Sequence, residues 1–563
     1  MIQIEKRTLL EVLNSACKEF GNENFVSWVD EKPLTYSQFA EKVTSVAKFL
    51  KDSGIVKNDK VAILSENHPN WSISYFAIVS IGAIAVPIMT EFHPSEVHHV
   101  LRHSESKAIF ISSKLFFKID DLEHDGLETK ILIDDFSIIP PQTKSDRLKD
   151  FLIEGKKELE KIKLAALKLV GLADDEVKED DLAAILYTSG TTGHSKGVML
   201  THKNIVSNAI STLGIVTLTH TDRMLSILPL FHTIESTLGL VTPMLCGSKV
   251  FYLNKPPTAA ALLPALAKVK PTAMVAVPLV IEKIFKMKIL PQLTSKYLVR
   301  NLYKLPAVRK KLHKVAGKKL LKTFGSELRM FCIGGAPISA EVERFLNEGG
   351  FPYAIGYGLT ETSPLLTGTG PETIRLRSAG KPIPEVEIEI RDKDQITGEG
   401  EIYAKGPMVM KGYYKDPEKS KEVLTDDGWF KTGDLGVLDK DGYLFIKGRS
   451  KNVIIGSNGK NIYPEEIESI VNENPYVLES LVHDKEGKLI ARVFLNSEAI
   501  NNDHQIEKLN ESKTREIIDK ILVDILNNVN NSVSSFSKLH RVIEQAEPFE
   551  KTPTQKIKRY LYM

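Results

Sequence analysis

Residues 184–197 read Ala-Ile-Leu-Tyr-Thr-Ser-Gly-Thr-Thr-Gly-His-Ser-Lys-Gly, an apolar run that leads into a loop of hydroxyl-bearing residues and glycines. Hydroxyl groups, and the backbone N–H groups that glycine leaves accessible, can surround phosphate oxygens, while a lysine adds positive charge. The stretch therefore predicts a phosphate-binding loop at the end of a buried strand. Its candidate ligands are Thr188, Ser189, Gly190, Thr191, Thr192, Gly193 and Lys196.

Two positions exclude a P-loop of the GxxxxGK[ST] type. Ser195 stands where that motif has its second glycine, and Gly197 stands where it has Ser or Thr. An ordinary Ser/Thr-rich surface loop is also disfavoured, because such residues rarely gather between a buried strand and a basic residue.

Outward from this loop, short β-rich runs alternate with helical patterns, which predicts an α/β fold with sheets covered by helices. After Lys381, turn signals at 398–400, 426–428 and 439–442 punctuate short strands and predict a small β subdomain. A separate module follows Gly448. The expected strands are Val61–Leu64, Ala108–Ile111, Ile131–Ile133, Ala184–Tyr187, Met224–Leu228, Lys249–Tyr252, Ala273–Val277 and Met330–Ile333, and helices are expected at 464–472 and 511–528.

Composition is typical of a soluble globular protein, with 563 residues, 42% apolar residues and 26% charged residues. The 74 basic and 72 acidic residues leave a net charge of +2, so no global field favours nucleic acid. Three widely spaced cysteines favour a reducing cytoplasm over a disulfide framework or structural zinc. We see no signal peptide at the N-terminus.

One stretch imitates a membrane span, because Trp71–Met89 contains no charged residue and approaches the length needed to cross a bilayer. Gly82 and Pro87 interrupt it, so we expect a buried helix to about Ser80, a turn and a short buried strand at 83–87 instead.

Two further segments carry biased charge. Residues 156–170 predict an amphipathic surface helix. Residues Lys283–Lys322 contain eleven lysines, two arginines and no Asp or Glu. The segment is either a solvated helical face or a docking surface for anionic lipid or an acidic carrier protein.

The loop at 187–197 resembles the signature of the adenylate-forming (AMP-binding) superfamily, and the chain looks closest to bacterial long-chain fatty acid–CoA ligases. The family usually has proline where Ser195 stands. Further motifs follow in the family's order over nearly the whole chain: Leu228–His232, Gly334–Pro337, Tyr357–Glu361, Trp429–Asp434, Gly448–Lys451, Asn458–Ile467 and Thr552–Lys556, with Gln555 where many relatives have glycine.

The resemblance implies a role for each motif. It places His232 at a gate beside the acyl pocket, and Gly335, Ala336 and Pro337 beside adenine. Tyr357 would stack on adenine next to Gly358, Thr360 would bind the α-phosphate, and Glu361, with Thr191, would hold Mg²⁺. Asp434 and Arg449 would contact ribose, Gly459 would lie in the thiol-tunnel loop, and Lys556 would be the catalytic lysine. Unaided by the resemblance, His232 reads as a packed core residue.

The implied architecture is a large N-terminal domain, residues 1–448, built from two α/β subdomains and a β subdomain. A small mobile α+β domain, residues 449–563, would turn about a hinge at Lys451. ATP and Mg²⁺ are the implied cofactors, and a fatty acid and coenzyme A are the implied substrates. The enzyme is expected to be a monomer or homodimer.

Physical chemistry supports this reading, since a carboxylate is already ionised at pH 7 and needs no general base to attack. The difficulty is to bring two anions together, which cations achieve by positioning and charge stabilisation. Two rival classes explain less. Ser/Lys nucleophile chemistry leaves Glu361 and Asp434 without a role, and a nucleotide sensor would not need Lys556. Acyl–acyl-carrier-protein ligation, or ligation of a medium-chain or aryl acid, remains an alternative; no downstream carrier domain is expected.

Overall fold

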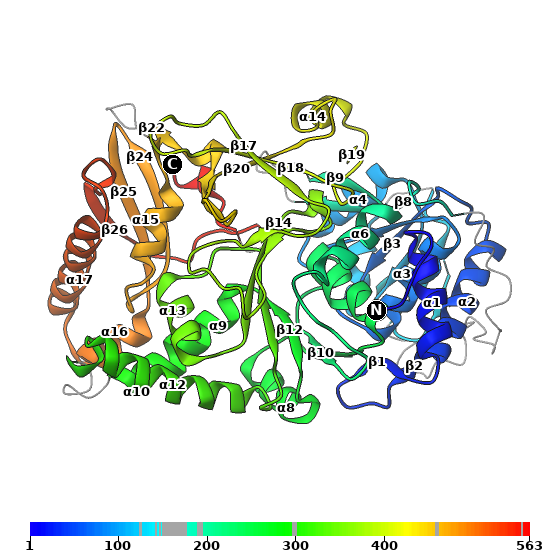
Figure 1. Ribbon diagram of the computed structural model, residues 1–563, viewed down its shortest axis with the longest axis horizontal. Helices are drawn as coiled ribbons and strands as arrows, with labels where there is room; N and C mark the ends of the chain where they lie inside the picture. Colours follow the sequence, from blue (N-terminus) through cyan, green and yellow to red (C-terminus); the bar gives the residue numbers. More distant parts are fainter. Residues whose placement is uncertain are drawn as a thin grey trace.

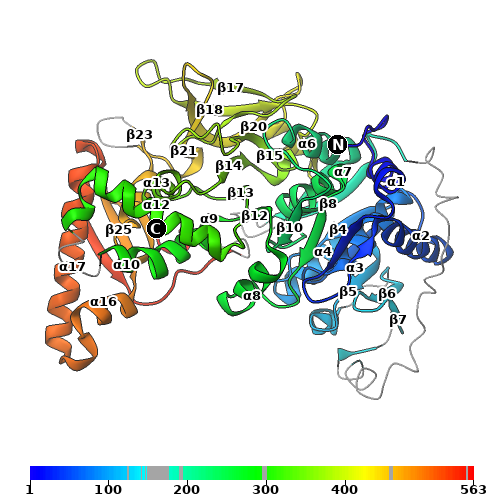
Figure 2. The same cartoon turned by 60° about the horizontal axis from the view of Figure 1, so that its bottom comes forward.

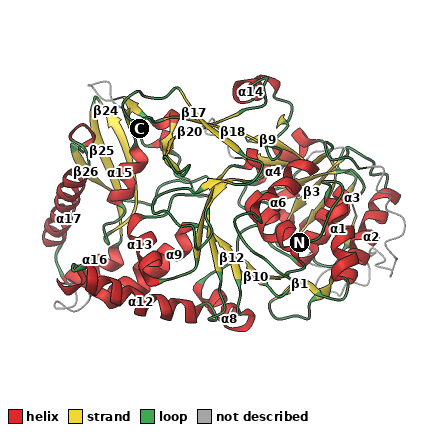
Figure 3. Cartoon of the chain, in the orientation of Figure 1, coloured by secondary structure: helices red, strands yellow, loops and turns green. Residues whose placement is uncertain are grey.

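The computed structural model describes residues 1–122, 126–140, 143–145, 148, 177–188, 195–294, 301–455, 461–552 and 556–563. Two large sheets with their helices form the body, and a β subdomain and a C-terminal α+β domain lie beside it (Figures 1 and 3). The α/β class and the large-plus-small division are as expected. The helix predicted at 156–170 lies outside the described residues.

The first sheet is eight-stranded, in the order β19-β9-β8-β4-β3-β5-β6-β7. Its strands β4, β3, β5 and β6 run parallel, and β8 joins them through β4. The bounds are β3 (Lys60–Leu64), β4 (Ile84–Pro87), β5 (Ser106–Ile111), β6 (Thr129–Leu132), β7 (Ser137–Ile139), β8 (Leu182–Thr188), β9 (Lys196–Thr201) and β19 (Gly412–Tyr413).

The second sheet is nine-stranded, in the order β16-β15-β14-β13-β12-β10-β11-β1-β2. The run from β14 to β1 is parallel, and the strands at both edges are antiparallel. The bounds are β1 (Asn24–Trp28), β2 (Leu34–Thr35), β10 (Arg223–Ser226), β11 (Lys249–Tyr252), β12 (Ala273–Ala276), β13 (Met330–Ile333), β14 (Tyr353–Gly358), β15 (Leu365–Gly368) and β16 (Lys381–Pro382).

Several helices of the body begin at side-chain caps. Thr35 and Gln38 form a capping box at the start of α2, and Thr201 and Asn204 form another at α6. The bounds are α1 (Leu9–Phe20), α2 (Tyr36–Asp52), α3 (Pro69–Ser80), α4 (Pro94–Ser104), α6 (His202–Thr212), α7 (Thr242–Cys246), α8 (Ala259–Val269), α9 (Pro278–Ile284), α10 (Leu290–Thr294), α12 (Pro306–Thr323) and α13 (Ala340–Gly349), with π-helices η3 (Ile234–Val241) and η4 (Phe285–Ile289).

The apolar stretch 71–89 folds as expected, as the buried helix α3 followed by the buried strand β4. Trp71 and Phe76 of α3 pack in the same hydrophobic cluster as residues of both sheets. The two subdomains of the body therefore share a continuous core. Among the described helices, none is long and apolar enough to cross a membrane.

The β subdomain is a four-stranded antiparallel sheet in the order β17-β18-β20-β21, and the predicted turn at Asp439–Gly442 connects its last two strands. Its bounds are β17 (Glu387–Arg391), β18 (Gly400–Lys405), β20 (Phe430–Leu438) and β21 (Leu444–Arg449), with α14 (Pro417–Val423) between β18 and β20.

The C-terminal domain has its own cluster of buried apolar residues between a three-stranded sheet and its helices (Figure 1). Polar contacts join it to the rest of the protein: Lys447 Nζ lies 3.2 Å from Glu466, and Tyr463 donates to Glu399. The bounds are β22 (Ile454–Ile455), β23 (Asn461–Ile462), α15 (Pro464–Val471), β24 (Val477–Lys485), β25 (Lys488–Leu495), α16 (Ser497–His504), α17 (Glu511–Ser532) and β26 (Arg541–Gln545).

Asp222 ties together the amino ends of β10, β12 and β13. Its buried carboxylate accepts hydrogen bonds from Thr272 Oγ1 at 2.6 Å and from Arg329 at 2.6 and 2.7 Å, and from the Thr219 N–H at 2.8 Å. Burial alone would raise the pKa of Asp222, but the bonds from Thr272 and Arg329 outweigh burial and hold the pKa below its ordinary value.

We expect Asp222→Ala to lower the free energy of unfolding of the body by about 3 kcal/mol, because it leaves a buried hydroxyl and a guanidinium without their acceptor. Urea unfolding would measure the loss. Since the folded pKa is depressed, the stabilisation is present above the unfolded pKa and is lost as pH falls through the folded pKa. Asp52→Asn at the exposed pair with Lys48 should change stability by under about 0.5 kcal/mol; equal effects of the two variants would contradict this role.

Candidate active site

Three of the predicted motifs follow neighbouring parallel strands of the second sheet. The gate motif with His232 follows β10, the Gly335–Pro337 loop follows β13, and Thr360 and Glu361 follow β14. Because β10, β12, β13 and β14 are parallel neighbours, their carboxyl ends meet at one edge, where α/β sheets bind ligands. The topology brings these motifs together.

Glycine shapes this edge at two positions. Gly335 adopts a positive φ of 84° in the exposed loop before α13. At Gly358 a Cβ would lie 1.8 Å from the carbonyl oxygen of Pro364 on the returning chain. No other residue fits at 358 without moving the backbone that carries Tyr357 and Thr360.

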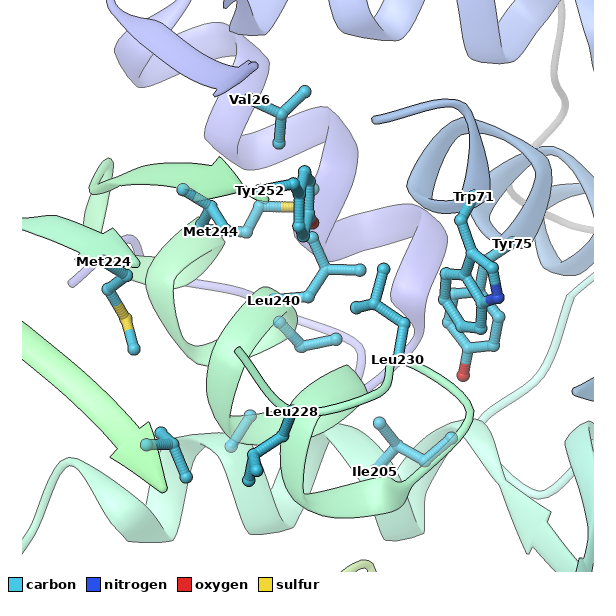
Figure 4. Close-up of a cluster of buried hydrophobic side chains, with 14 of the residues drawn as sticks. Val26, Trp71, Tyr75, Ile205, Met224, Leu228, Leu230, Leu240, Met244 and Tyr252 are labelled. Carbon is cyan, nitrogen blue, oxygen red and sulfur yellow. The ribbon is translucent and has the colours of Figure 1, made fainter. Parts of the chain in front are cut away.

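The gate motif is held between two cores. Leu228 and Leu230 are buried among Trp71, Ile205 and Tyr252 (Figure 4). The next residue, Phe231, belongs to the other core, formed around the first sheet. This anchoring leaves His232 half-buried.

The His232 ring lies 4.6 Å, centroid to centroid, from that of Phe231. Burial, and next the positive charge of Lys556, lower the pKa of His232 to about 4. The imidazole is therefore neutral at pH 7.

Asp434 and Arg449 face each other across the β20–β21 ladder, where they are paired in register. Arg449 Nε lies 2.8 Å from Asp434 Oδ1, and the Tyr357 hydroxyl donates to Oδ2 at 2.7 Å. Burial raises the pKa of Asp434, although Arg449 and Tyr357 oppose that shift. The predicted adenine-stacking residue and both predicted ribose contacts thus meet at one place.

The predicted phosphate-binding loop lies between β8 and β9, which pair antiparallel, with Thr188 opposite Lys196. A P-loop would lead into a helix, so the strand that follows agrees with the exclusion made from spacing. Residues Ser189, Gly190, Thr191, Thr192 and Gly193, and Gly459 of the predicted thiol-tunnel loop, lie outside the described residues.

Tyr413 connects two of the predicted site residues and was missed by sequence reasoning. Its hydroxyl donates to Glu361 Oε1 at 3.0 Å, and Lys196 Nζ lies 5.0 Å from the centre of its ring. The hydrogen bond needs the two-residue strand β19, which pairs Tyr413 with Val198 of β9. The only sequence signal is an aromatic pair after Lys-Gly at 411–414.

Lys556, from the C-terminal domain, shares this site. Although the residue as a whole is exposed, desolvation and then the charge of Arg449 lower the pKa of its ammonium, and Asp434 and Glu361 oppose the shift. The pKa of Lys451 is lowered by desolvation and then by Arg449, Lys196 and Lys556. Positive groups from separate segments therefore converge here, which favours a polyanionic ligand.

Comparison with known proteins agrees with this geometry. The family model described as AMP-binding enzyme matches residues 13–414. The long-chain-fatty-acid–CoA ligase FadD15 of Mycobacterium bovis is 28% identical over 486 residues, covering 81% of this chain and 75% of that protein. The chloroplastic long-chain-fatty-acid–[acyl-carrier-protein] ligase AEE15 of Arabidopsis thaliana is 26% identical over 635 aligned residues. The alignment covers 99% of this chain and 85% of that protein.

The crystal structure of the anthranilate CoA ligase AuaEII with anthranoyl-AMP is similar in fold. It superposes with a TM-score of 0.77 at 21% identity, covering 98% of this chain and 96% of that one. ATP, Mg²⁺ and coenzyme A fit the family to which these proteins point. With its fold, its converging motifs and a family match over most of its length, this chain belongs to the AMP-binding enzymes, the adenylate-forming ATP-dependent acid–thiol ligases.

Proposed function

We propose that the protein is a long-chain fatty acid–CoA ligase. In the first step the fatty acid carboxylate attacks the α-phosphorus of ATP, forming acyl-AMP and releasing pyrophosphate. In the second, the thiol of coenzyme A attacks the acyl carbonyl, forming acyl-CoA and releasing AMP. The observation that carries the proposal is the convergence of Lys196, Arg449 and Lys556 beside Glu361 and Asp434.

The site residues suit the first step. Lys196 and Lys556 offset the repulsion between carboxylate and triphosphate and stabilise charge that develops as pyrophosphate leaves. Thr360, which precedes Glu361 in the sequence, would bind the α-phosphate. Asp434 would accept from the ribose hydroxyls, and Tyr357 and the loop of Gly335, Ala336 and Pro337 would flank adenine, with Gly358 holding the backbone close.

The residues also fit a magnesium ion. Glu361 offers a carboxylate, and Mg²⁺ commonly uses one or two protein carboxylates beside phosphate oxygens and water. When bound, the ion would neutralise phosphate charge and orient the leaving pyrophosphate. Tyr413 acts here as a positioning residue, because its hydroxyl holds the Glu361 carboxylate. Thr191 is proposed as a further contact.

His232 would serve as a gate between the acyl pocket and the thiol path. The neutral imidazole can accept or donate a hydrogen bond without adding charge next to the acyl carbonyl. Because its pKa is about 4, it cannot act as a cation at neutral pH.

The two steps make opposite demands on the C-terminal domain. During adenylation Lys556 must lie over the α-phosphate, where Asp434 and Glu361 already influence it. A thiol needs a path to the same carbonyl, so that loop must leave and the segment containing Gly459 must replace it. We propose that residues 449–563 turn about Lys451 as one rigid domain. The polar contacts across the joint, Lys447 with Glu466 and Tyr463 with Glu399, suit a joint that opens.

The names of relatives such as FadD15 support both a long-chain fatty acid as the substrate and CoA as the acceptor. The name of AEE15 supports acyl carrier protein as an alternative acceptor. Medium-chain or aryl acids are the alternative substrates. We place the enzyme in the cytoplasm, because its three cysteines are free, as is usual in a reducing compartment. We expect it to be a monomer or homodimer.

With fatty acids from C2 to C18, ATP and Mg²⁺, we expect thioester formation to be fastest with long chains and with CoA as the acceptor. Acyl carrier protein, assayed at equal thiol concentration, should be used at least tenfold more slowly. A preference for short or aryl acids, or for the carrier protein, would replace the long-chain CoA assignment while leaving the ligase class intact.

Tyr413→Phe removes one hydrogen bond to a charged group, which is typically worth about 1.5–3 kcal/mol. We expect ATP–pyrophosphate exchange to slow by about tenfold or more and its half-saturating Mg²⁺ concentration to rise, because Glu361 is less well fixed. Glu361→Ala defines the full loss. The matched control, Tyr414→Phe, should retain activity within about twofold, and an unchanged Mg²⁺ dependence in Tyr413→Phe would refute the positioning role.

Half-reactions separate the two domain arrangements. Lys556→Ala should slow adenylate formation by a factor of hundreds, since one such electrostatic contact is worth about 3–4 kcal/mol. It should spare thioester formation from supplied acyl-adenylate. Lys451→Pro, which fixes φ near −65°, should show the reverse pattern, with adenylation kept within about tenfold. If each variant slowed both half-reactions to the same extent, the proposed rotation of residues 449–563 about Lys451 would be contradicted.

A further inference from the structure

The outward side of α12 carries a dense set of exposed lysines, here called the lysine face. It comprises Lys310, Lys311, Lys314, Lys318, Lys319 and Lys322. The sequence of α12, residues 306–323, contains no Asp or Glu. Helix surfaces that only contact water usually mix charges of both signs at spacings of three and four, because opposite charges there stabilise a helix and like charges destabilise it.

The opposite side of α12 fixes this orientation. His313, Gly317 and Leu320 on that side are buried in the body of the protein. A Cβ at Gly317 would lie 2.4 Å from the carbonyl oxygen of Gly349 in α13, so the two helices are in close backbone contact. Arg309 is 2.8 Å from Glu348 of α13, which leaves that arginine out of the lysine face. The helix cannot rotate without losing this packing.

Within the lysine face, Lys310, Lys314, Lys318 and Lys322 follow one another at intervals of four residues. Side chains at that spacing lie one above another along a helix, so the four ammonium groups form a continuous row of like charge. Within the described residues we find no ion pair that neutralises the row. The arrangement destabilises the isolated helix, which argues for a negatively charged partner.

One large apolar side chain is exposed among these lysines, and another just before the helix. Val315 is 57% exposed and lies three or four residues from Lys311 and Lys318, and Leu305, just before the helix, is 53% exposed. Helices that lie on membranes combine lysines that meet phosphate headgroups with apolar side chains that enter the headgroup boundary.

The wider basic segment is not one surface. Lys286 donates to the backbone oxygen of Asn472 at 2.7 Å, and desolvation lowers the pKa of its ammonium. Lys286 therefore faces the C-terminal domain and is not part of the lysine face.

The lysine face itself lies on the exterior. Figures 1 and 2 show α12 along the outside of the molecule, away from β17 and β18.

We propose that the lysine face docks the protein on the anionic phospholipid surface of a membrane. Its uniform charge complements a surface of phosphate headgroups, and Val315 and Leu305 supply the apolar contact. Docking would give the enzyme access to fatty acids dissolved in the bilayer, and this consequence rests on the proposed function. The docking itself does not, because it requires neither ATP nor catalysis.

Co-sedimentation of the full-length protein with vesicles tests the proposal, without ATP or CoA. At low salt we expect binding to phosphatidylglycerol-containing vesicles, little binding to phosphatidylcholine alone, and release as salt rises. Lys311→Glu/Lys318→Glu should weaken binding by about thirtyfold or more. Lys393→Glu/Lys440→Glu makes the same charge change on exposed lysines of the β subdomain and should bind as the unaltered protein does.

Val315→Ser with Leu305→Ser should make the remaining binding more easily released by salt. Circular dichroism and pyrophosphate exchange, unchanged in all variants, would show that each is folded. Equal binding to both vesicle types, or equal loss in the β-subdomain control, would overturn the proposal. Binding of the same variants to acyl carrier protein should also be measured. If Lys311→Glu/Lys318→Glu kept its binding to vesicles but lost binding to acyl carrier protein, the lysine face would be a docking site for an acidic protein instead.

Discussion

Electrostatic repulsion within the active site is the constraint on which the rest of this structure depends. Lys196, Arg449, Lys451 and Lys556 come from distant parts of the sequence, yet their charges act on one another. Asp434 and Glu361 offset only part of that charge. Such a site remains assembled without its anionic ligand only if the surrounding framework is rigid enough to resist the repulsion.

The framework meets this demand by joining two sheets through a shared core. The gate motif inserts Leu230 into one core and Phe231 into the other, so the chain before His232 cannot shift without disturbing both. The parallel strands β10, β12, β13 and β14 bring the remaining motifs to a common edge. Precision at the site is thus a property of the strands rather than of the loops that carry the functional groups.

Local patterns predicted much of this. Strands such as Lys249–Tyr252 and Met330–Ile333 were recognisable because apolar runs are bounded by turn residues, and both have the predicted bounds. The strand expected to reach Leu228 ends at Ser226, because the chain turns into the gate motif. Motif residues were recognised as chemical groups, but their mutual distances depend on strand order, which a sequence pattern does not encode.

Long-range pairing accounts for what was missed. The strand β19 has only two residues and exists because it pairs with β9, so nothing local to Tyr413 indicates its bond to Glu361. Asp222 was missed for the same reason, since its partners Thr272 and Arg329 are distant in sequence. The two-residue strands β2 and β16 likewise need neighbours to form.

The separate core of the C-terminal domain has a thermodynamic consequence. Its buried residues, from Ile462 to Val542, form their own cluster, and its contacts with Lys447 and Lys286 of the body are polar. Cooperativity in unfolding follows shared apolar burial more than ion pairs. The domain should therefore melt as an independent unit in calorimetry. The heat-capacity trace would then contain two peaks. The change in the temperature difference between them when a nucleotide binds would measure how strongly the nucleotide couples the two parts.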